Sequence, residues 1–210
     1  SCNRALGLAP LQEEVCVTNS RRPELMIIGD SKAMALSSGI FAGHVSMPTL
    51  MIAGHGCNTF PNLTYEPTYE NPWANNCTNI ANKALKLAGA IPSIKTIMVV
   101  EGDISVANSP SIYSFEDRPL SHKEAVRLGY DFLFRTLYDT GRKVIFVTDV
   151  PDLKKDPRFC IGKPDHFSKY CNNSSEVLKT SRANYNLETR ELAELYGFHW
   201  FDSLEVFCAE

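Results

Sequence analysis

The chain has 210 residues, 44% of them hydrophobic and 21% charged, which is the composition of one globular domain with a buried core. Its 21 Lys and Arg against 24 Asp and Glu give a net charge of -3 without a basic stripe, which excludes the phosphate-binding surface of a nucleic-acid-binding protein. The longest apolar runs, such as residues 25–28 and 97–100, are far below the roughly 18 residues that a membrane helix needs.

Residues 1–23 are predicted to form a disulfide-stapled extension and linker, and residues 24–210 the main domain. In that domain, short apolar runs predict strands over about 25–29, 48–53, 95–100, 143–148 and 198–201. Helical spacing predicts helices over about 32–41, 78–90, 121–140 and 174–196. Ser121 and Glu124 form a capping box at the third helix, and Gly141 and Gly197 are expected to end the last two helices.

Helical connections between successive short strands require a parallel sheet with right-handed crossovers. The predicted fold class is therefore α/β, a flavodoxin-like three-layer α/β/α sandwich built on a parallel sheet of roughly five strands.

Seven cysteines indicate an oxidising compartment such as a periplasm, a cell surface or a secretory lumen. Their spacing predicts three disulfides, Cys2–Cys16, Cys57–Cys77 and Cys160–Cys171, and leaves Cys208 without a partner. Zinc is the competing explanation, but the sequence contains no Cys-x-x-Cys or His-x-x-x-His spacing, so no metal site is predicted.

Ser31 is the candidate nucleophile. The apolar run Met26–Ile28 stops at Gly29-Asp30-Ser31, which places Ser31 at the carboxyl edge of the predicted sheet and at a helix N-terminus. Unpaired backbone N–H groups and the positive end of the helix dipole would stabilise an oxyanion there. The alternative is that Asp30 or Ser31 merely caps the helix, as these residue types often do.

Further candidates follow the other predicted strands, because the carboxyl ends of parallel strands share one crevice. Gly54 and Gly56 could each present an N–H to an oxyanion, although a turn that needs a positive φ explains them equally well. His55 is the one histidine in a plausible crevice loop and the candidate base. The acidic residues are Glu101, Asp103, Asp149 and Asp202, and for the last two we expect helix capping or a solvated loop.

Gly29-Asp30-Ser31 after the first strand, with a glycine after the second, resembles the SGNH (GDSL-type) hydrolase family. The resemblance covers about residues 24–210 and is closest to the periplasmic SGNH domains fused to membrane-bound polysaccharide O-acyltransferases. Four local patterns of the sequence resemble that subgroup: residues 29–33, 56–58, 143–151 with Cys160, and 200–208.

The resemblance implies that Ser31 attacks an acyl ester, that a His is the base and an Asp orients it, and that the N–H groups of Ser31 and Gly56 form the oxyanion hole. It implies O-acyl, most often O-acetyl, transfer to a carbohydrate such as a bacterial surface polysaccharide, or ester hydrolysis on one, without a cofactor. The acyl donor would come from a membrane acyltransferase domain on the same chain. The domain would be extracytoplasmic, in the periplasm, and tethered to the inner membrane.

The sequence departs from the family pattern at three places. Lys32 stands where the subgroup has His. Glu101-Gly102-Asp103 stands where the family has an oxyanion-hole Asn, and an ionised carboxylate cannot donate a hydrogen bond. The family's Asp-x-x-His does not occur in the 210 residues. We therefore expect the natural protein to continue past Glu210 with a cysteine that pairs with Cys208, followed by the catalytic Asp and His.

Two other functions stay open at this point. The missing Asn and His are also compatible with a catalytically degenerate domain that binds glycan or docks a partner. A flavodoxin-like anion or nucleotide binder would use the same helix N-terminus, but the turn lacks the glycine density of phosphate-binding loops.

Overall fold

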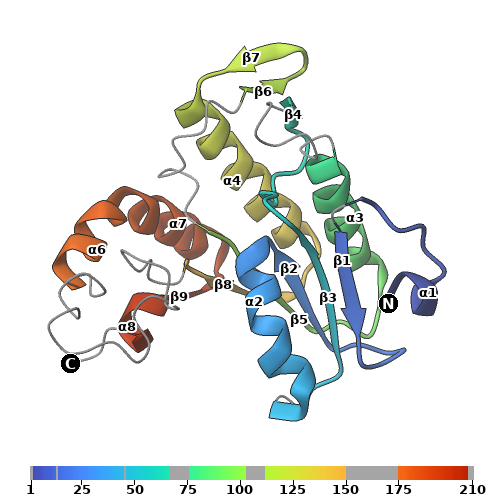
Figure 1. Cartoon of the computed structure of the whole chain (residues 1–210). Helices are drawn as coiled ribbons and strands as arrows, with labels where there is room; N and C mark the ends of the chain where they lie inside the picture. Colours follow the sequence, from blue (N-terminus) through green and yellow to red (C-terminus); the bar gives the residue numbers. More distant parts are fainter. Residues whose placement is uncertain are drawn as a thin grey trace, which may run out of the picture.

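The computed structural model describes residues 2–12, 14–44, 46–66, 76–102, 112–149 and 175–207. A six-stranded sheet in the order β1-β3-β2-β5-β8-β9 forms the centre of this part of the chain (Figure 1). Five of its strands are parallel, and β1 is antiparallel to its neighbour β3. The strands are β1 (Glu14–Thr18), β2 (Leu25–Gly29), β3 (Thr49–Gly54), β5 (Thr96–Val100), β8 (Lys143–Val147) and β9 (His199–Phe201).

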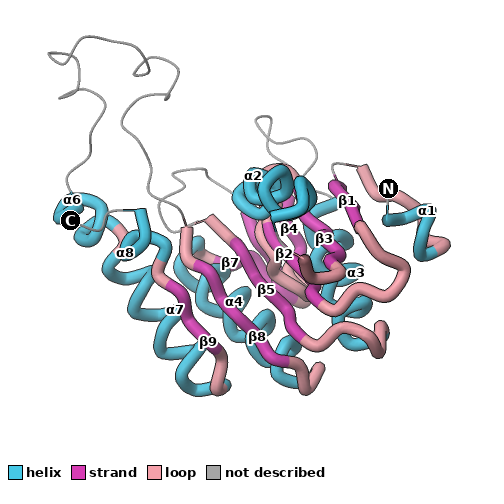
Figure 2. Tube along the Cα trace, turned by 90° about the horizontal axis from the view of Figure 1, so that it is seen from below, coloured by secondary structure: helices cyan, strands magenta, loops and turns pink. Residues whose placement is uncertain are grey.

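Helices cover both faces of this sheet. Figure 2 shows α2 on one face and α3, α4 and α7 on the other. The longer helices are α2 (Ser31–Gly39), which continues into the π-helical turn η1 (Ile40–His44), α3 (Cys77–Ala90), α4 (His122–Asp139) and α7 (Ala183–Tyr196). Three short helices are also described: α1 (Cys2–Leu6), α6 (Ser175–Ser181) and α8 (Ser203–Phe207). The predicted α/β/α sandwich is confirmed. Helices α2 and α3 lie on opposite faces because α2 connects β2 to β3 in one direction along the sheet, whereas α3 connects β3 to β5 in the other.

The core lies on the two faces of the central strands. All five residues of β2 and all six of β3 are buried, as a strand covered on both faces requires. Tyr130, Phe134 and Phe146 pack edge to face or tilted between α4 and β8. The capping box of Ser121 and Glu124 opens α4 as predicted. Positive φ angles of 63° and 70° at Gly141 and Gly197 confirm the two helix stops.

Three parts of the fold differ from the predicted elements. The extension contains α1 and β1, and β1 joins the main sheet as its antiparallel edge strand. A second sheet of three short strands, β4 (Thr64–Glu66), β6 (Ile112–Phe115) and β7 (Arg118–Leu120), was not predicted; it lies beyond α3 and α4 in Figure 1. The single helix expected over 174–196 is two helices, separated at Arg182. In the described residues, no helix is both long and apolar enough to cross a membrane.

Two of the expected disulfides are present in the structure, Cys2–Cys16 and Cys57–Cys77. The expected pair Cys160–Cys171 lies outside the described residues, as does Cys208, which was expected to lack a partner within the chain. The first disulfide joins α1 to β1, and the second joins the loop after β3 to the start of α3.

A buried ion pair also holds the N-terminal segment to the domain. The Lys83 Nζ on α3 lies 2.7 Å from Oε2 of Glu14, a side chain with no exposed surface. Lys83 also donates to the Asn3 side chain and the Ala9 carbonyl, at 2.7 and 2.8 Å. A buried carboxylate is tolerated only when it is paired, so Lys83 makes β1 part of the folded domain.

Replacing Lys83 by alanine is expected to lower the free energy of unfolding by about 2–3 kcal/mol, because Glu14 stays buried without its cation. Denaturant unfolding of the purified protein measures this difference. Lys86→Ala on the same helix is the matched control, because Lys86 is exposed and its removal should change stability by no more than about 0.5 kcal/mol. Equal stability of the two variants would contradict the role given to the Lys83–Glu14 pair.

Candidate active site

The candidate site lies where β2, β3 and β5 end side by side. The parallel register pairs Gly29 with Ala53 on one side and with Val100 on the other. A Cβ at Gly29 would overlap the Val100 carbonyl oxygen, so only glycine allows these two strand ends to approach this closely. The residues that follow Gly29 are thereby placed against the end of β5.

Asp30 ties the start of α2 to the end of β5. It is the N-cap of α2, and its Oδ1 accepts the Lys32 N–H at 2.7 Å while its Oδ2 accepts the Gly102 N–H at 2.9 Å. Burial raises the pKa of this carboxyl, the two backbone donors lower it, and nearby Asp149 raises it further. The capping alternative is therefore correct for Asp30, which positions its neighbour Ser31.

Ser31 is the first residue of α2 and is half-buried. In the part of the chain that the structure describes, its side chain has no hydrogen-bond partner. Its backbone N–H belongs to the first turn of the helix, where N–H groups have no partner within the helix. Ser31 thus lies at the predicted edge of the sheet. Its own backbone N–H has no partner within the helix, and no described residue forms a hydrogen bond with its hydroxyl as a base would.

His55 follows β3 and is exposed, with no hydrogen bond or ion pair to any described residue. The structure therefore shows no hydrogen bond between the candidate base and Ser31. The neighbouring Gly56 adopts a positive φ of 64°, as the turn alternative requires, and it is exposed at the surface. Gly54 is buried, and a Cβ there would lie 2.6 Å from that of Cys57, so its glycine serves close packing.

Lys32 forms an ion pair with Asp149 across the strand ends. The Lys32 Nζ lies 3.2 Å from Oδ1 of Asp149, and Arg182 approaches Oδ2 at 3.5 Å and donates to the Asp149 carbonyl at 2.7 Å. Asp149 was expected to cap a helix or to be solvated; that expectation is wrong, because Asp149 is 4% exposed and lies between two cations. Asp202 does cap a helix, since its Oδ1 accepts the Leu204 N–H of α8 at 2.9 Å.

Sequence reasoning missed Arg182, which is 3% exposed. A single arginine inside a predicted helix is usually solvated, so nothing in the sequence indicated its burial. The break between α6 and α7 occurs at this residue, where the side chain reaches the end of β8.

Glu101 is fully buried directly after β5. Its Oε1 accepts the Thr59 backbone N–H from the loop after β3, and its backbone carbonyl accepts the Tyr185 hydroxyl at 3.2 Å. Its Oε2 is buried and has no hydrogen-bond partner among the described residues. Burial raises the pKa of this carboxyl to about 8, against the lowering effect of Thr59 and with a smaller contribution from Asp30. Glu101 is therefore a neutral acid at pH 7. Asp103, the other candidate of this segment, lies outside the described residues.

The raised pKa of Glu101 predicts how stability depends on pH. The unfolded chain loses this proton from about pH 4.5 upward, whereas the folded protein keeps it up to about pH 8. The folded state binds more protons in this window, so the free energy of unfolding should fall on the order of 1 kcal/mol per pH unit and then level off. Thermal unfolding between these limits should show the slope in the natural protein and a shallower one in Glu101→Gln. Glu205→Gln, at an exposed position, is the control and should keep the full slope.

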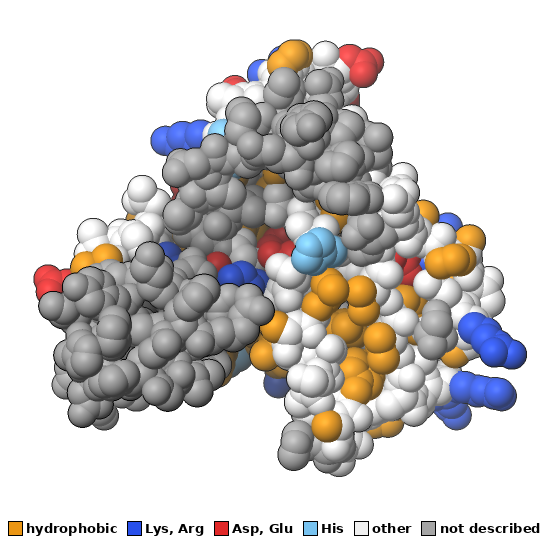
Figure 3. All heavy atoms as spheres, in the orientation of Figure 1, with side chains coloured by type: hydrophobic (Ala, Val, Ile, Leu, Met, Phe, Trp, Pro, Cys, Tyr) orange, Lys and Arg blue, Asp and Glu red, His pale blue; other side chains and the backbone are white. Residues whose placement is uncertain are grey.

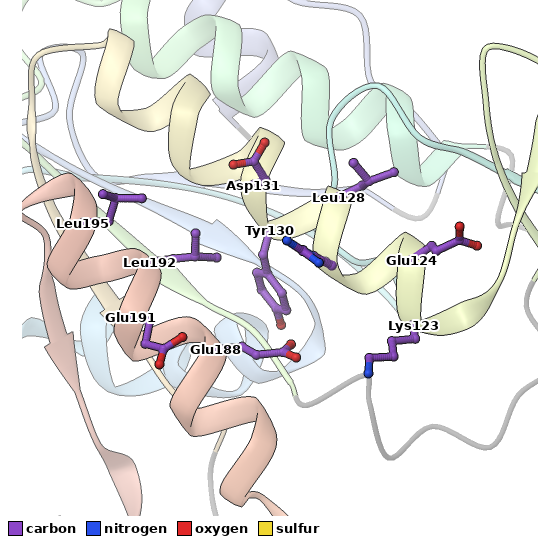
Figure 4. Close-up of a pocket in the computed structure, with 10 residues that line it drawn as sticks. Lys123, Glu124, Leu128, Tyr130, Asp131, Glu188, Glu191, Leu192 and Leu195 are labelled. Carbon is purple, nitrogen blue, oxygen red and sulfur yellow. The ribbon is translucent and has the colours of Figure 1, made fainter.

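Figure 3 shows acidic and basic side chains together in the hollow near the middle of one face, beside a histidine and above an apolar patch. A separate groove of about 850 Å³ lies between α4 and α7. Figure 4 shows its lining, with Lys123 on one wall and Glu188 and Glu191 on the other. None of the residues expected at the site lines this groove, so we place the candidate site at the strand ends. The described residues include no group of three or more His, Cys, Asp or Glu arranged to hold a metal ion.

The chain matches a protein-family model and shares its fold with a solved structure. A family model described as SGNH domain (fused to AT3 domains) matches residues 1–210. The periplasmic domain of the lipopolysaccharide acetyltransferase of Salmonella ser. Paratyphi A superposes with a TM-score of 0.58 at 10% identity, covering 86% of this chain and 66% of that one. This similarity shows a shared fold, and the chain spans less than two thirds of the length of that structure.

The esterase domain from a Rhodothermus marinus protein matches at a TM-score of 0.27 and 10% identity, over 65% of this chain and 76% of that one. A TM-score this low does not establish a common fold. A search of curated protein sequences finds no significant match.

Proposed function

This chain belongs to the family of SGNH domains that are fused to AT3 domains, and from that membership we propose that it carries out O-acyl transfer or ester hydrolysis with Ser31 as nucleophile. The observation that carries the proposal is the position of Ser31 at the end of β2 and the start of α2. The carboxylate of Asp30 holds this junction to the end of β5 through two backbone N–H groups.

The chemistry follows from that position. Ser31 Oγ attacks the acyl carbonyl and its proton passes to a base, which leaves a tetrahedral oxyanion at the positive end of α2. The N–H groups of Ser31 and Gly56 are the proposed donors to this oxyanion. The oxyanion then collapses and expels the leaving group of the acyl donor, which takes the proton from the base. The acyl group stays on Ser31 until an acceptor hydroxyl or water attacks it and releases the Ser31 hydroxyl. Among the described residues no histidine forms a hydrogen bond with Ser31, so the proposal takes the base from outside them.

For the acceptor we propose a carbohydrate, with acetyl as the acyl group. The support is the fold shared with the periplasmic domain of a lipopolysaccharide acetyltransferase. Fusion to AT3 domains in the family supports an acyl donor delivered by a membrane acyltransferase domain, and hence a tethered domain outside the cytoplasm. The two disulfides are consistent with an oxidising compartment.

Labelling with a phosphonofluoridate tests the nucleophile in the full-length protein. We expect one equivalent of label on Ser31, because the reagent modifies a serine whose hydroxyl is activated by a base. Ser38→Ala on the exposed side of the same helix is the matched control and should label fully, whereas Ser31→Ala should not label.

The second candidate function is a degenerate SGNH domain that binds glycan or docks a partner. It is favoured by the lack of a described base at Ser31. Full-length protein that binds glycan but takes up no label at Ser31 would support this function and contradict the first.

A further inference from the structure

The turn that carries Gly56 is anchored at several points. We call residues 54–59 the β3 turn. A backbone hydrogen bond from Cys57 to Gly54, 3.2 Å long, closes it, and the disulfide Cys57–Cys77 joins it to α3. The Asn58 side chain donates to the Tyr113 hydroxyl at 2.5 Å. At its far end, the Thr59 N–H donates to the carboxyl group of Glu101, which joins the turn to the end of β5.

The environment of Glu101 determines which form of the acid can fill this role. Thr59 approaches it from the β3 turn, Asp30 from the β2–α2 junction and Tyr185 from α7. Two cations near the strand ends, Lys32 and Arg182, form ion pairs with Asp149. An ionised Glu101 would therefore be a buried anion beside Asp30, and such a charge is costly without a cation.

We propose that Glu101 is a positioning residue, whose neutral carboxyl group holds the β3 turn against the end of β5 and so aligns the Gly56 N–H with Ser31. The inference rests on the proposed function, since it concerns the oxyanion hole of that reaction. Glu101 has no exposed surface and acts through Thr59 rather than on the substrate. Glu101 belongs to the segment 101–103, which stands where the family pattern has an oxyanion-hole Asn; as a neutral acid it accepts from Thr59 and keeps a proton on its second oxygen.

Ionisation of Glu101 strengthens the Thr59 hydrogen bond itself, but it places a buried anion beside Asp30. Water or cations drawn toward this charge should disturb the packing of the β3 turn against the end of β5. The raised pKa of about 8 places that change on the alkaline side of neutrality. Activity should therefore fall above about pH 8. This fall is separate from any change in the pH–rate profile that comes from titration of the base. Glutamine keeps the acceptor oxygen for Thr59 and cannot ionise, whereas leucine removes the acceptor at similar volume.

The test compares kcat/KM for p-nitrophenyl acetate hydrolysis by the full-length protein from about pH 6 to about pH 10. Glu101→Gln should match the natural protein within about threefold at neutral pH and lack the alkaline fall. The kcat/KM of Glu101→Leu should be about 10-fold to 100-fold lower at every pH, because a misplaced N–H group no longer stabilises the oxyanion of the transition state. An alkaline fall that persists in Glu101→Gln, or full activity in Glu101→Leu, would overturn the proposal.

A second measurement does not depend on turnover. Hydrogen exchange of the β3 turn is followed in the natural protein and in Glu101→Gln at about pH 7 and at about pH 9. We expect equal protection at the lower pH and faster exchange of the natural protein at the higher one. Equal protection at both would refute the anchor even if Ser31 is catalytic, and the expected difference would support it even if Ser31→Ala retains activity. The two proposals therefore fail separately.

Discussion

Full-length protein that carries Ser31→Ala is expected to lose O-acylation of the proposed glycan acceptor and hydrolysis of model esters by at least about 10³-fold. The alanine removes the only atom that can form the acyl-enzyme bond and leaves the helix N-terminus and the β3 turn in place. Folding should be unaffected, because the Ser31 side chain is half-buried and makes no hydrogen bond in the described part of the chain.

Acetate release from the purified glycan and single-turnover kinetics measure this loss, and the melting temperature checks that the variant is folded. Ser38→Ala is the matched control, since it removes the same hydroxyl from an exposed position of α2. Undiminished acylation by a folded Ser31→Ala protein would show that the nucleophile is another residue.

A second large effect is expected from Gly29→Ala, which should prevent stable folding. A Cβ at this position would overlap the Val100 carbonyl oxygen and lie 2.9 Å from the Cβ of Ala33. Both obstacles belong to backbone or to a rigid side chain, so β2 and β5 would have to separate at the centre of the sheet. We expect a cost of at least about 3 kcal/mol, a large part of the stability of a typical domain.

Gly39→Ala is the matched control for this substitution. Gly39 is the last residue of α2, and a Cβ there would meet nothing within 4 Å. Alanine should stabilise the protein by about 0.5–1 kcal/mol through helix propensity. Denaturant unfolding of both variants measures the contrast. A Gly29→Ala protein as stable as Gly39→Ala would mean that the two strand ends are not as close as described.

The alternation of apolar runs and helical spacing determined the architecture, because strands buried on both faces must be almost wholly apolar. The five strands of the predicted parallel sheet are present in the structure, as are the capping box at Ser121 and the glycine stops at Gly141 and Gly197. Two local cysteine pairs were predictable for a similar reason, since each closes a short loop. These features depend on residues close together in the chain.

The Gly29-Asp30-Ser31 junction could also be predicted from the sequence, because a strand that ends in a tight turn before a helix has one consistent geometry. What the sequence could not determine were features that depend on partners far along the chain. Residues 14–18 form strand β1 because they pair with the open edge of β3. The segment is short and only one of its five residues is buried, so its sequence did not predict a strand.

Burial of charge was decided by the tertiary structure alone. From the sequence, Asp149 was expected to cap a helix or to be solvated in a loop. In the structure it lies between Arg182 and Lys32, which is 117 positions earlier in the chain. Glu101 reads as an ionised carboxylate that would repel an oxyanion, but it is buried against Thr59 and stays neutral at pH 7. The ionisation of a side chain depends on what surrounds it, and for these residues the surroundings come from segments that only folding brings together.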